Sequence, residues 1–236
     1  MASYAVIGLG RFGMTVATIL AETGMEVLAI DKDQSLVDAI SGKVTQAICM
    51  NSTDEDALRN LNLDEMDAVI LGIGSNIEES VLTAAILKKI GVGMIHAKVE
   101  NELHGRILEL IGVQRVLLPE KIVGTQLAKT LSSRNILEYL TLTTGLGVME
   151  LLAPPEFVGK TLQELALPTT RKINVIAIKY NYLTVSDEGK NLIEQRMNEM
   201  PGANDVINEG DVLVLMGKIK DLDTLVDDLA QRKELL

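Results

Sequence analysis

Three glycines near the start of the chain have the spacing of a phosphate-binding turn. A short apolar run ends in Gly8, and a Gly-x-Gly-x-x-Gly pattern then opens into a helix-like segment. Glycines let the backbone approach a phosphate closely, and the following helix presents free N–H groups and the positive end of its dipole. The bare pattern also occurs in ordinary turns, but its place directly after a predicted strand favours a nucleotide site. The residues expected to contact the nucleotide here are Gly8, Gly10, Arg11, Phe12 and Gly13.

A carboxylate follows the second apolar run at about the spacing expected for a ribose contact. Residues 27–30 are apolar and lead to Asp31. A carboxylate at this point accepts hydrogen bonds from both ribose hydroxyls and repels a 2′-phosphate, so an NADP-type ligand is disfavoured. The alternative for Asp31 is a solvated carboxylate in a turn. Lys32, which follows directly, is a weaker candidate for the same site.

Arg11 lies inside the glycine turn, where its side chain can reach along the phosphates. A guanidinium there can hold a terminal phosphate with charge-assisted hydrogen bonds. NAD has no terminal phosphate in that direction, so Arg11 favours ATP or ADP as the ligand. The alternative is an exposed residue in the first turn of the helix.

The first half of the chain alternates short apolar runs with helical patterns, which predicts βαβ units and a Rossmann-like, doubly wound parallel sheet. Ligands bind where the carboxyl ends of such strands meet. Asn51 and Ser52 follow the third expected strand, Gly74 and Ser75 follow the fourth, and Lys98 closes the fifth. We expect these residues at the nucleotide site, although Asn51 and Ser52 could equally cap helices. The expected strands are 3–7, 26–30, 46–50, 68–73, 94–99 and 115–118, and the expected helices lie near 12–22, 34–40, 53–60, 77–90 and 102–111.

The second part of the chain has a different pattern. A helical stretch near 121–131 carries apolar residues at 123, 127 and 131, and this face needs a partner outside the completed sheet. Beyond a linker near 132–135, the pattern predicts a small α+β module. Its expected elements are a strand or hairpin over 140–152, a short helix over 162–167, strands over 174–180 and 212–217, a turn near 187–189 and an acidic helix over 219–232. The expected domains are therefore 1–134, which includes the unpartnered helix, and 135–236.

Composition excludes several classes of function. The chain has 236 residues and a formal net charge of −11, with no Trp and 3% aromatic residues, so we expect no nucleic-acid partner. No apolar run approaches the roughly 20 residues of a membrane span, and the start has no basic segment typical of a signal peptide, which predicts a cytoplasmic protein. The single cysteine, Cys49, excludes an internal disulfide.

Groups that could do catalysis are scarce. His96 lies in an apolar strand and is expected to be structural, whereas His104 lies on a helix and is expected to be exposed. Cys49 lies in a buried-strand pattern without a nearby partner. The sequence has neither a Walker A motif nor a Cys/His metal cluster, so we expect a binding protein and no enzyme. The alternative, an NAD(H)-binding redox sensor or NAD-dependent oxidoreductase, shares the glycine turn and Asp31.

Six segments together resemble a known family: GLGRFG at 8–13, VLAID at 27–31, IGSNI at 73–77, LPEK at 118–121, PGA at 201–203 and EGDVL at 209–213. The chain resembles the cytosolic regulatory subunits of bacterial potassium-uptake systems of the Ktr type, which are built from regulator-of-potassium-conductance (RCK) domains. The resemblance implies a nucleotide-binding domain followed by a TrkA-C domain, and a homodimer that exchanges the helix near 121–131. It also implies a homo-octameric ring on the inner face of the membrane, beneath an integral membrane potassium-translocating subunit, where ATP favours the conducting arrangement and ADP the closed one.

The same resemblance assigns roles to single residues. It places Arg11 on the γ-phosphate across the dimer, Asn51 near the adenine, and Glu120 on a divalent cation, Mg²⁺ or Ca²⁺, beside the phosphates. Without the resemblance, Glu120 is typical of a carboxylate favoured by a helix N-terminus. In some relatives the C-terminal domain binds cyclic di-AMP through an Asp and an Arg, but Ala166 and Pro168 stand at those positions here, which argues against this regulation.

Overall fold

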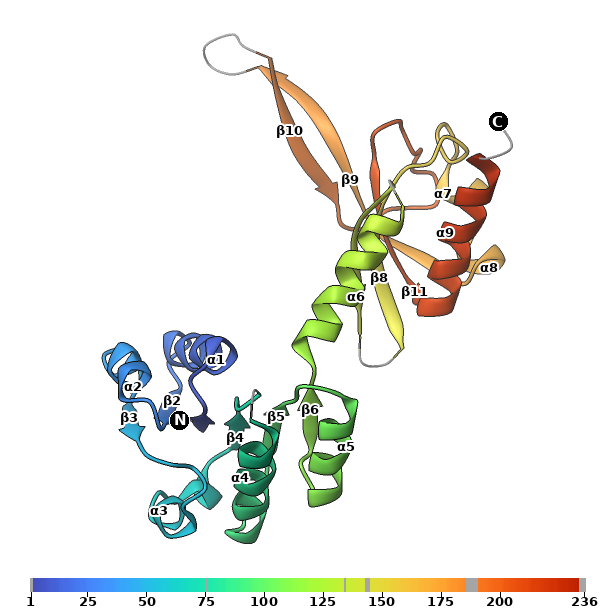
Figure 1. Cartoon of the computed structure of the whole chain (residues 1–236). Helices are drawn as coiled ribbons and strands as arrows, with labels where there is room; N and C mark the ends of the chain where they lie inside the picture. The colour runs from blue at the N-terminus through green and yellow to red at the C-terminus, as the bar shows by residue number, and fades with distance from the viewer. Residues whose placement is uncertain (1, 75, 134, 143–144, 186–190, 234–236) are drawn as a thin grey trace. The chain divides into compact units, whose positions relative to one another are not determined.

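The computed structural model of the chain describes residues 2–74, 76–133, 135–142, 145–185 and 191–233. The chain forms two compact units, Met1–Glu120 and Lys121–Leu236 (Figure 1), and each is described by itself.

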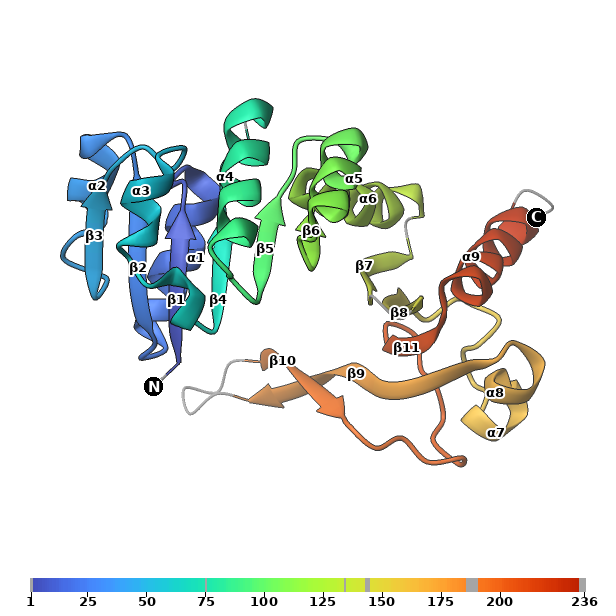
Figure 2. The ribbon, with the colours of Figure 1, turned by 90° about the horizontal axis from the view of Figure 1, so that it is seen from below.

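The first unit is built on one six-stranded parallel sheet, as the sequence predicts. Its strand order is β3-β2-β1-β4-β5-β6, and Figure 2 follows it from β3 at one edge to β6 at the other. The chain moves outward from β1 to β3 on one side and then returns to β4 on the other side of β1, so the order reverses between β1 and β4. The strands are β1 (Ser3–Ile7), β2 (Glu26–Asp31), β3 (Gln46–Cys49), β4 (Ala68–Leu71), β5 (Ile95–Lys98) and β6 (Arg115–Leu117).

Alternating apolar side chains bury both faces of this sheet. On β1, Val6 points to one core, while its neighbours Ala5 and Ile7 point to the other. The core on the Val6 face is packed by α1 (Arg11–Glu22) and α2 (Gln34–Ile40), and the opposite core is packed by α3 (Glu55–Arg59), α4 (Ile77–Lys89) and α5 (Glu102–Ile111). A short 3₁₀ helix, η1 (Leu63–Glu65), precedes β4. All carboxyl ends of the strands therefore lie along one edge.

The second unit is an α+β module, again as predicted. Its antiparallel sheet has the order β10-β9-β11-β8-β7. One face packs an apolar core against helices, with Leu222 and Leu225 of the last helix fully buried. The predicted turn near 187–189 lies outside the described residues. The elements are β7 (Ile136–Thr141), β8 (Leu146–Leu152), α7 (Leu162–Leu165), α8 (Leu167–Thr170), β9 (Ile173–Val185), β10 (Asn191–Asn198), β11 (Val212–Lys218) and α9 (Ile219–Lys233).

The helix α6 (Pro119–Ser132) has no buried residue. Val123, Leu127 and Leu131 keep 61%, 57% and 75% of their surface exposed, so none of the described residues covers the apolar face predicted from the sequence. At its carboxyl end, Lys129 pairs with Asp223 of α9 at 2.9 Å. The predicted domain boundary after residue 134, which assigns α6 to the first domain, stays a prediction.

Two sequence-based expectations about single side chains are wrong. Cys49 is exposed, because β3 is the edge strand of the sheet and has a neighbour on one side only. His104 is 1% exposed, because it lies on the face of α5 that also buries Gly105 and Leu108.

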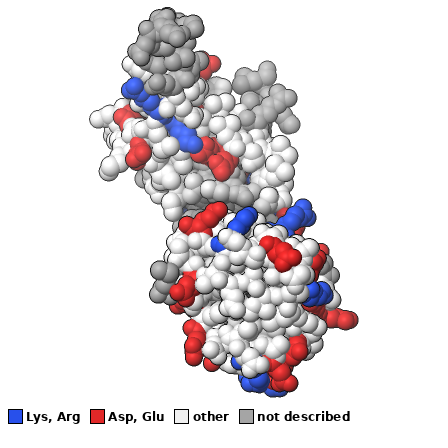
Figure 3. All heavy atoms as spheres, turned by 90° about the vertical axis from the view of Figure 1, so that its left-hand side faces the viewer, with Lys and Arg blue, Asp and Glu red and all other residues white. Residues whose placement is uncertain are grey.

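On the face in Figure 3, the Lys and Arg side chains lie scattered among Asp and Glu.

Candidate functional site

Packing within the chain requires two of the three motif glycines. Gly8 has a φ of +92°, and a Cβ there would lie 2.9 Å from Cγ1 of Ile73. A Cβ on Gly13 would lie 1.9 Å from the carbonyl oxygen of Gly8, and one on Gly72 would lie 2.5 Å from the same oxygen. Gly8, Gly13 and Gly72 thus allow the end of β1, the start of α1 and the end of β4 to meet at close range.

Gly10 is different, because no heavy atom lies within 4 Å of the position that its Cβ would occupy. Its φ of −59° suits any residue, so neither packing nor conformation requires a glycine. Gly10 is the N-cap of α1 and provides no side-chain acceptor, so the first N–H groups of this helix remain available to a ligand. By contrast, side chains of Asp33, Asp54, Asn76 and Asn101 cap α2 to α5. Open space beside uncapped N–H groups is the geometry of an anion site.

Asp31 ties the glycine turn to the end of β2. Its Oδ2 accepts a hydrogen bond from the N–H of Leu9 at 2.6 Å, and its Oδ1 accepts one from the N–H of Asp33 at 2.9 Å. Each carboxylate oxygen can accept more than one hydrogen bond, so both remain able to accept a ribose hydroxyl. Asp31 therefore has a positioning role in the turn that the sequence pattern did not indicate, in addition to the predicted ribose contact.

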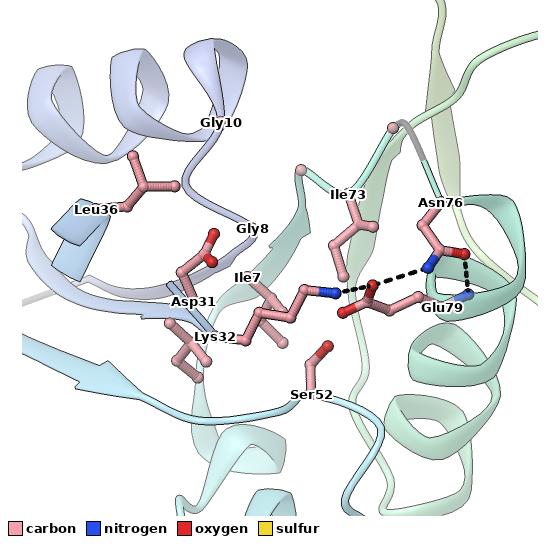
Figure 4. Close-up of a pocket in the computed structure, with 13 residues that line it drawn as sticks. Ile7, Gly8, Gly10, Asp31, Lys32, Leu36, Ser52, Ile73, Asn76 and Glu79 are labelled. Carbon is pink, nitrogen blue, oxygen red and sulfur yellow. Dashed lines mark hydrogen bonds and ion pairs between the residues drawn. The ribbon is translucent and has the colours of Figure 1, made fainter. Parts of the chain in front are cut away.

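These parts surround a cavity of about 250 Å³ at the carboxyl edge of the sheet (Figure 4). Of the predicted residues, the structure brings Gly8, Gly10, Asp31, Lys32, Ser52 and Gly74 together around it. Sequence reasoning missed Glu79, which lies in the first turn of α4 and lines the cavity. The signal that could have found it is its place just after the fourth strand, at the same edge. The remaining lining residues are Ile7, Ile30, Leu36, Gly72, Ile73 and Asn76.

Lys32 and Glu79 form an ion pair across this cavity. The Nζ of Lys32 donates to Oε2 of Glu79 at 2.7 Å, and the Nδ2 of Asn76 donates to the same oxygen at 3.1 Å. Figure 4 shows the Lys32 side chain extended from the end of β2 toward α4, with the Ser52 hydroxyl beside the pair. The hydrogen bond to Glu79 raises the pKa of Lys32, which therefore stays a cation at neutral pH. The pair adds charged groups to a lining that also contains the apolar side chains of Ile7 and Ile73.

Other predicted residues lie outside the cavity lining. Arg11, Phe12 and Gly13 form the first turn of α1, with Arg11 exposed. The side chain of Asn51 is exposed and accepts hydrogen bonds from the N–H and hydroxyl of Thr53, so it stabilises a turn. Ser75 lies outside the described residues.

Lys98 and Glu120 also form an ion pair, with Nζ and Oε1 2.8 Å apart. The hydrogen bond from Lys98 lowers the pKa of Glu120, and Arg11 contributes to the same shift by its charge. The stem of Lys98 lies beside Gly74, since a Cβ on that glycine would be 3.4 Å from the lysine. Among the described residues, no group of three His, Cys, Asp or Glu side chains could hold a metal ion. Glu120 is thus a single carboxylate near the turn.

A second cavity, of about 390 Å³, lies in the second unit. The described residues that line it are all uncharged, and they include Ala166, Pro168 and Asn174. Ala166 has a φ of +46°, in the left-handed region that disfavours residues with a Cβ.

Two family models match the chain. The TrkA-N domain matches residues 4–119 and the TrkA-C domain matches residues 148–230. The sequence is 36% identical over 219 residues to the Ktr system potassium uptake protein C of Bacillus subtilis (strain 168), and the match covers 93% of each chain. This chain belongs to the Ktr potassium-uptake family of RCK regulatory subunits. It is also 32% identical to the Ktr system potassium uptake protein A of Vibrio alginolyticus, over 91% of each chain. The predicted family is confirmed.

Solved structures support the same fold. The structure of the GsuK RCK domain has a TM-score of 0.60 at 18% identity, and the match covers 95% of this chain and 47% of that one. The GsuK channel bound to NAD has a TM-score of 0.62 at 17% identity, with 94% of this chain and 38% of that one covered. The predicted Rossmann-like sheet followed by a TrkA-C domain is therefore confirmed. Within the described part of the chain, no helix is both long and apolar enough to cross a membrane.

Proposed function

We propose that this chain is a cytoplasmic, nucleotide-sensing gating subunit of a potassium-uptake system, and that it switches state by binding and without catalysis. The observation that carries the proposal is the open space at Gly10 beside the uncapped N-terminus of α1, with Asp31 facing the same cavity. Phosphates would bind the N–H groups of the turn, and the ribose hydroxyls would bind Asp31. Membership of the Ktr family supports an integral membrane potassium-translocating subunit as the partner.

The switch would distinguish ATP from ADP through Arg11. Because Arg11 is exposed and lies outside the cavity lining, its guanidinium is free to reach the γ-phosphate bound by a second copy of the chain. A ligand shifts a conformational equilibrium only when its affinity differs between the two states. A contact made by the γ-phosphate alone supplies such a difference.

Calorimetry with ATP and ADP on the wild type and on Arg11→Ala tests this role. We expect the variant to lose on the order of 10- to 100-fold in ATP affinity, the effect of one charged hydrogen-bonded contact, with little change for ADP. Arg59→Ala is the matched control, since Arg59 is an exposed arginine that pairs with Glu55 on α3. Equal losses of ATP and ADP affinity in Arg11→Ala would remove the sensor role.

A divalent cation, Mg²⁺ or Ca²⁺, would bind between Glu120 and the phosphates. A cation of this kind is held by one or two carboxylates together with phosphate oxygens, so a single carboxylate is sufficient only when nucleotide is present. Lys98 pairs with Glu120 at 2.8 Å and would move to a phosphate when the cation binds. We therefore expect Mg²⁺ to bind only in the presence of ATP. Glu120→Gln should lose this ATP-dependent Mg²⁺ binding.

Assembly into a homodimer and then a homo-octameric ring requires two separate surfaces on each chain. The exposed face of α6, with Val123, Leu127 and Leu131, is one candidate. The other is α5, where Leu103 and Leu110 keep 70% and 89% of their surface exposed. By light scattering, we expect Leu127→Glu to give monomers and Leu110→Glu to stop assembly at the dimer. A stable wild-type monomer at micromolar concentration would contradict the proposal.

An NAD(H)-binding redox sensor or NAD-dependent oxidoreductase is the second candidate. Asp31 suits the ribose of NAD as well as that of ATP, and the similar GsuK channel structure is described as bound to NAD. Competition between NADH and ATP decides between the two candidates. Displacement of ATP by equimolar NADH, or turnover of any substrate with NADH, would favour the second candidate.

A further inference from the structure

The cavity extends beyond the positions of phosphate and ribose. With the phosphates on the Gly8–Gly10 turn and the sugar on Asp31, the lining that remains for the base includes the polar residues Lys32, Ser52, Asn76 and Glu79 and several apolar neighbours. Ile73 and Leu36 provide apolar surface against which a flat ring can pack. The Ser52 hydroxyl is hydrogen-bonded to Thr83 at 2.9 Å and the Asn76 amide donates to Glu79 at 3.1 Å, so the ion pair of Lys32 and Glu79 is the charged group that meets the edge of the base.

The two oxygens of Glu79 are in different situations. Oε2 accepts hydrogen bonds from Lys32 at 2.7 Å and from Asn76 at 3.1 Å, so the side chain is held in one orientation. The other oxygen, Oε1, accepts no hydrogen bond from the part of the chain that the structure describes. The side chain of Glu79 is 11% exposed, and no buried side-chain oxygen among the described residues lacks a partner, so Oε1 keeps some accessible surface and can accept a hydrogen bond from a bound ligand. A bound donor would satisfy Oε1.

The pair thus presents one acceptor beside one cation. Adenine presents the complementary edge, since its N6 amino group is a donor and the adjacent N1 is an acceptor. Guanine presents two adjacent donors, N1–H and the N2 amino group, next to O6. Because Oε2 is already occupied, at least one guanine donor would face Lys32 or lack an acceptor, and an unpaired buried polar group lowers affinity.

We propose that Glu79 is the residue that selects adenine over guanine, with Oε1 accepting a hydrogen bond from the N6 amino group and Lys32 and Asn76 holding Oε2. The proposal rests on the proposed nucleotide function and adds its base specificity. Asp31 and the glycine turn contact groups that ATP and GTP share, so they cannot make this distinction. Lys32 acts as a positioning residue in it.

The experiment measures ATP and GTP affinity by calorimetry for the wild type, Glu79→Gln and Lys32→Met. We expect the wild type to prefer ATP on the order of 10- to 100-fold, the effect of one hydrogen bond to a charged group. Glu79→Gln should reduce this ratio to below about threefold by weakening ATP, because an amide offers a donor as well as an acceptor. Lys32→Met should reduce the ratio by strengthening GTP, since it frees Oε2 to accept the second guanine donor.

Glu78→Gln is the matched control, because Glu78 is the neighbouring carboxylate on α4 and does not line the cavity. It should keep the wild-type ratio. Lys32 has a side chain that is 59% exposed, so Lys32→Met tests the proposal even if Glu79→Gln folds poorly. Equal affinities in the wild type, or a ratio unchanged by both variants, would overturn the role of Glu79 and leave the proposed function standing. Failure of the wild type to bind any adenine nucleotide would overturn the proposed function itself.

Discussion

Two cavities, one in each unit, differ in what they offer a ligand. The cavity of the first unit combines uncapped helix N–H groups with the charged side chains of Asp31, Lys32 and Glu79. The larger cavity of the second unit is lined, among the described residues, by uncharged side chains such as Ala166 and Pro168. A phosphate loses its hydration on binding and needs charged or N–H partners in return. Cavity volume alone therefore does not identify a nucleotide site. The smaller cavity, in the first unit, is the better candidate for binding a nucleotide.

The largest effect should come from the glycine turn, where packing and ligand binding can be separated. Gly13→Ala places a Cβ 1.9 Å from the Gly8 carbonyl oxygen, and we expect it to destabilise the first unit by about 3 kcal/mol or more. Gly10→Ala meets no atom within 4 Å, so its cost to stability should stay within about 1 kcal/mol. Its nucleotide affinity should nevertheless fall at least about tenfold. Urea unfolding and calorimetry on both variants measure the two effects.

If Gly10→Ala bound nucleotide as tightly as the wild type, the open space beside Gly10 would not be the phosphate site, and the contrast between the two cavities would lose its main support.

The next largest effect is the thermal stabilisation of the wild type by two different ligands, ATP and cyclic di-AMP. At a concentration of 100 times its dissociation constant, ATP should stabilise the native protein by about 2.7 kcal/mol and raise the melting temperature. Cyclic di-AMP should give no shift, because Ala166 and Pro168 stand where the family resemblance would place its charged partners. Thermal scans with each ligand provide the measurement. A shift with cyclic di-AMP that survives in Gly10→Ala would show that the uncharged cavity binds a dinucleotide after all.

A smaller effect concerns pH, because the only two histidines of the chain lie in the first unit. Burial lowers the pKa of His104, whose ring nitrogens contact the Ser80 hydroxyl at 3.1 Å and the N–H of Glu100 at 3.3 Å. Burial, and then the charge of Arg115, lower the pKa of His96. A histidine with a lowered folded-state pKa takes up its proton more readily when unfolded, so its stabilisation is full above the unfolded pKa and is lost as the pH falls below it.

We therefore expect the first unit to lose stability between about pH 7 and pH 5 while the second unit, without histidine, changes less. Urea unfolding monitored by hydrogen exchange resolves the two units. His104→Gln should weaken the pH dependence of the first unit. A steeper acid loss in the second unit would contradict this assignment.

The smallest effect is expected at Ala166, in the uncharged cavity. Its φ of +46° lies in the left-handed region, so Ala166→Gly should stabilise the second unit by about 0.5–1 kcal/mol. Ala153→Gly, in the same unit, has no positive φ to relieve and should not stabilise it. A urea midpoint for Ala166→Gly at or below that of the wild type would show that this backbone conformation carries no strain.

Much of the fold and part of the site could be predicted from the sequence. The six strands of the first unit follow from alternating apolar runs and helical patterns, because the periods of strand and helix are set by local geometry. Local geometry also explains why the sequence predicts Gly8, Gly10 and Asp31, since a motif of fixed spacing reflects a local backbone conformation. The resemblance places Asn51 near the adenine; its Oδ1 accepts hydrogen bonds from Thr53 in the structure, and the adenine contact stays a prediction.

The errors at Cys49 and His104 have a different physical origin. An apolar strand pattern does not reveal whether the strand lies at the centre or the edge of the sheet, and Cys49 is exposed because β3 is at the edge. A single histidine in a helix does not reveal which face is buried, and His104 is buried because Ser80 of α4 provides a hydrogen-bond partner. Both outcomes depend on neighbours that are distant in sequence.

The order of the elements, the glycine turn and the carboxylate after the second strand can be predicted from the sequence alone, because each depends on residues close together in the chain. Two other features depend on long-range packing. Gly10 faces open space while Gly13 is packed against backbone, and Lys32 contacts Glu79 across the cavity. These two residues are 47 positions apart. Their contact exists because the parallel sheet brings the ends of β2 and β4 to one edge, and no local pattern encodes that distance.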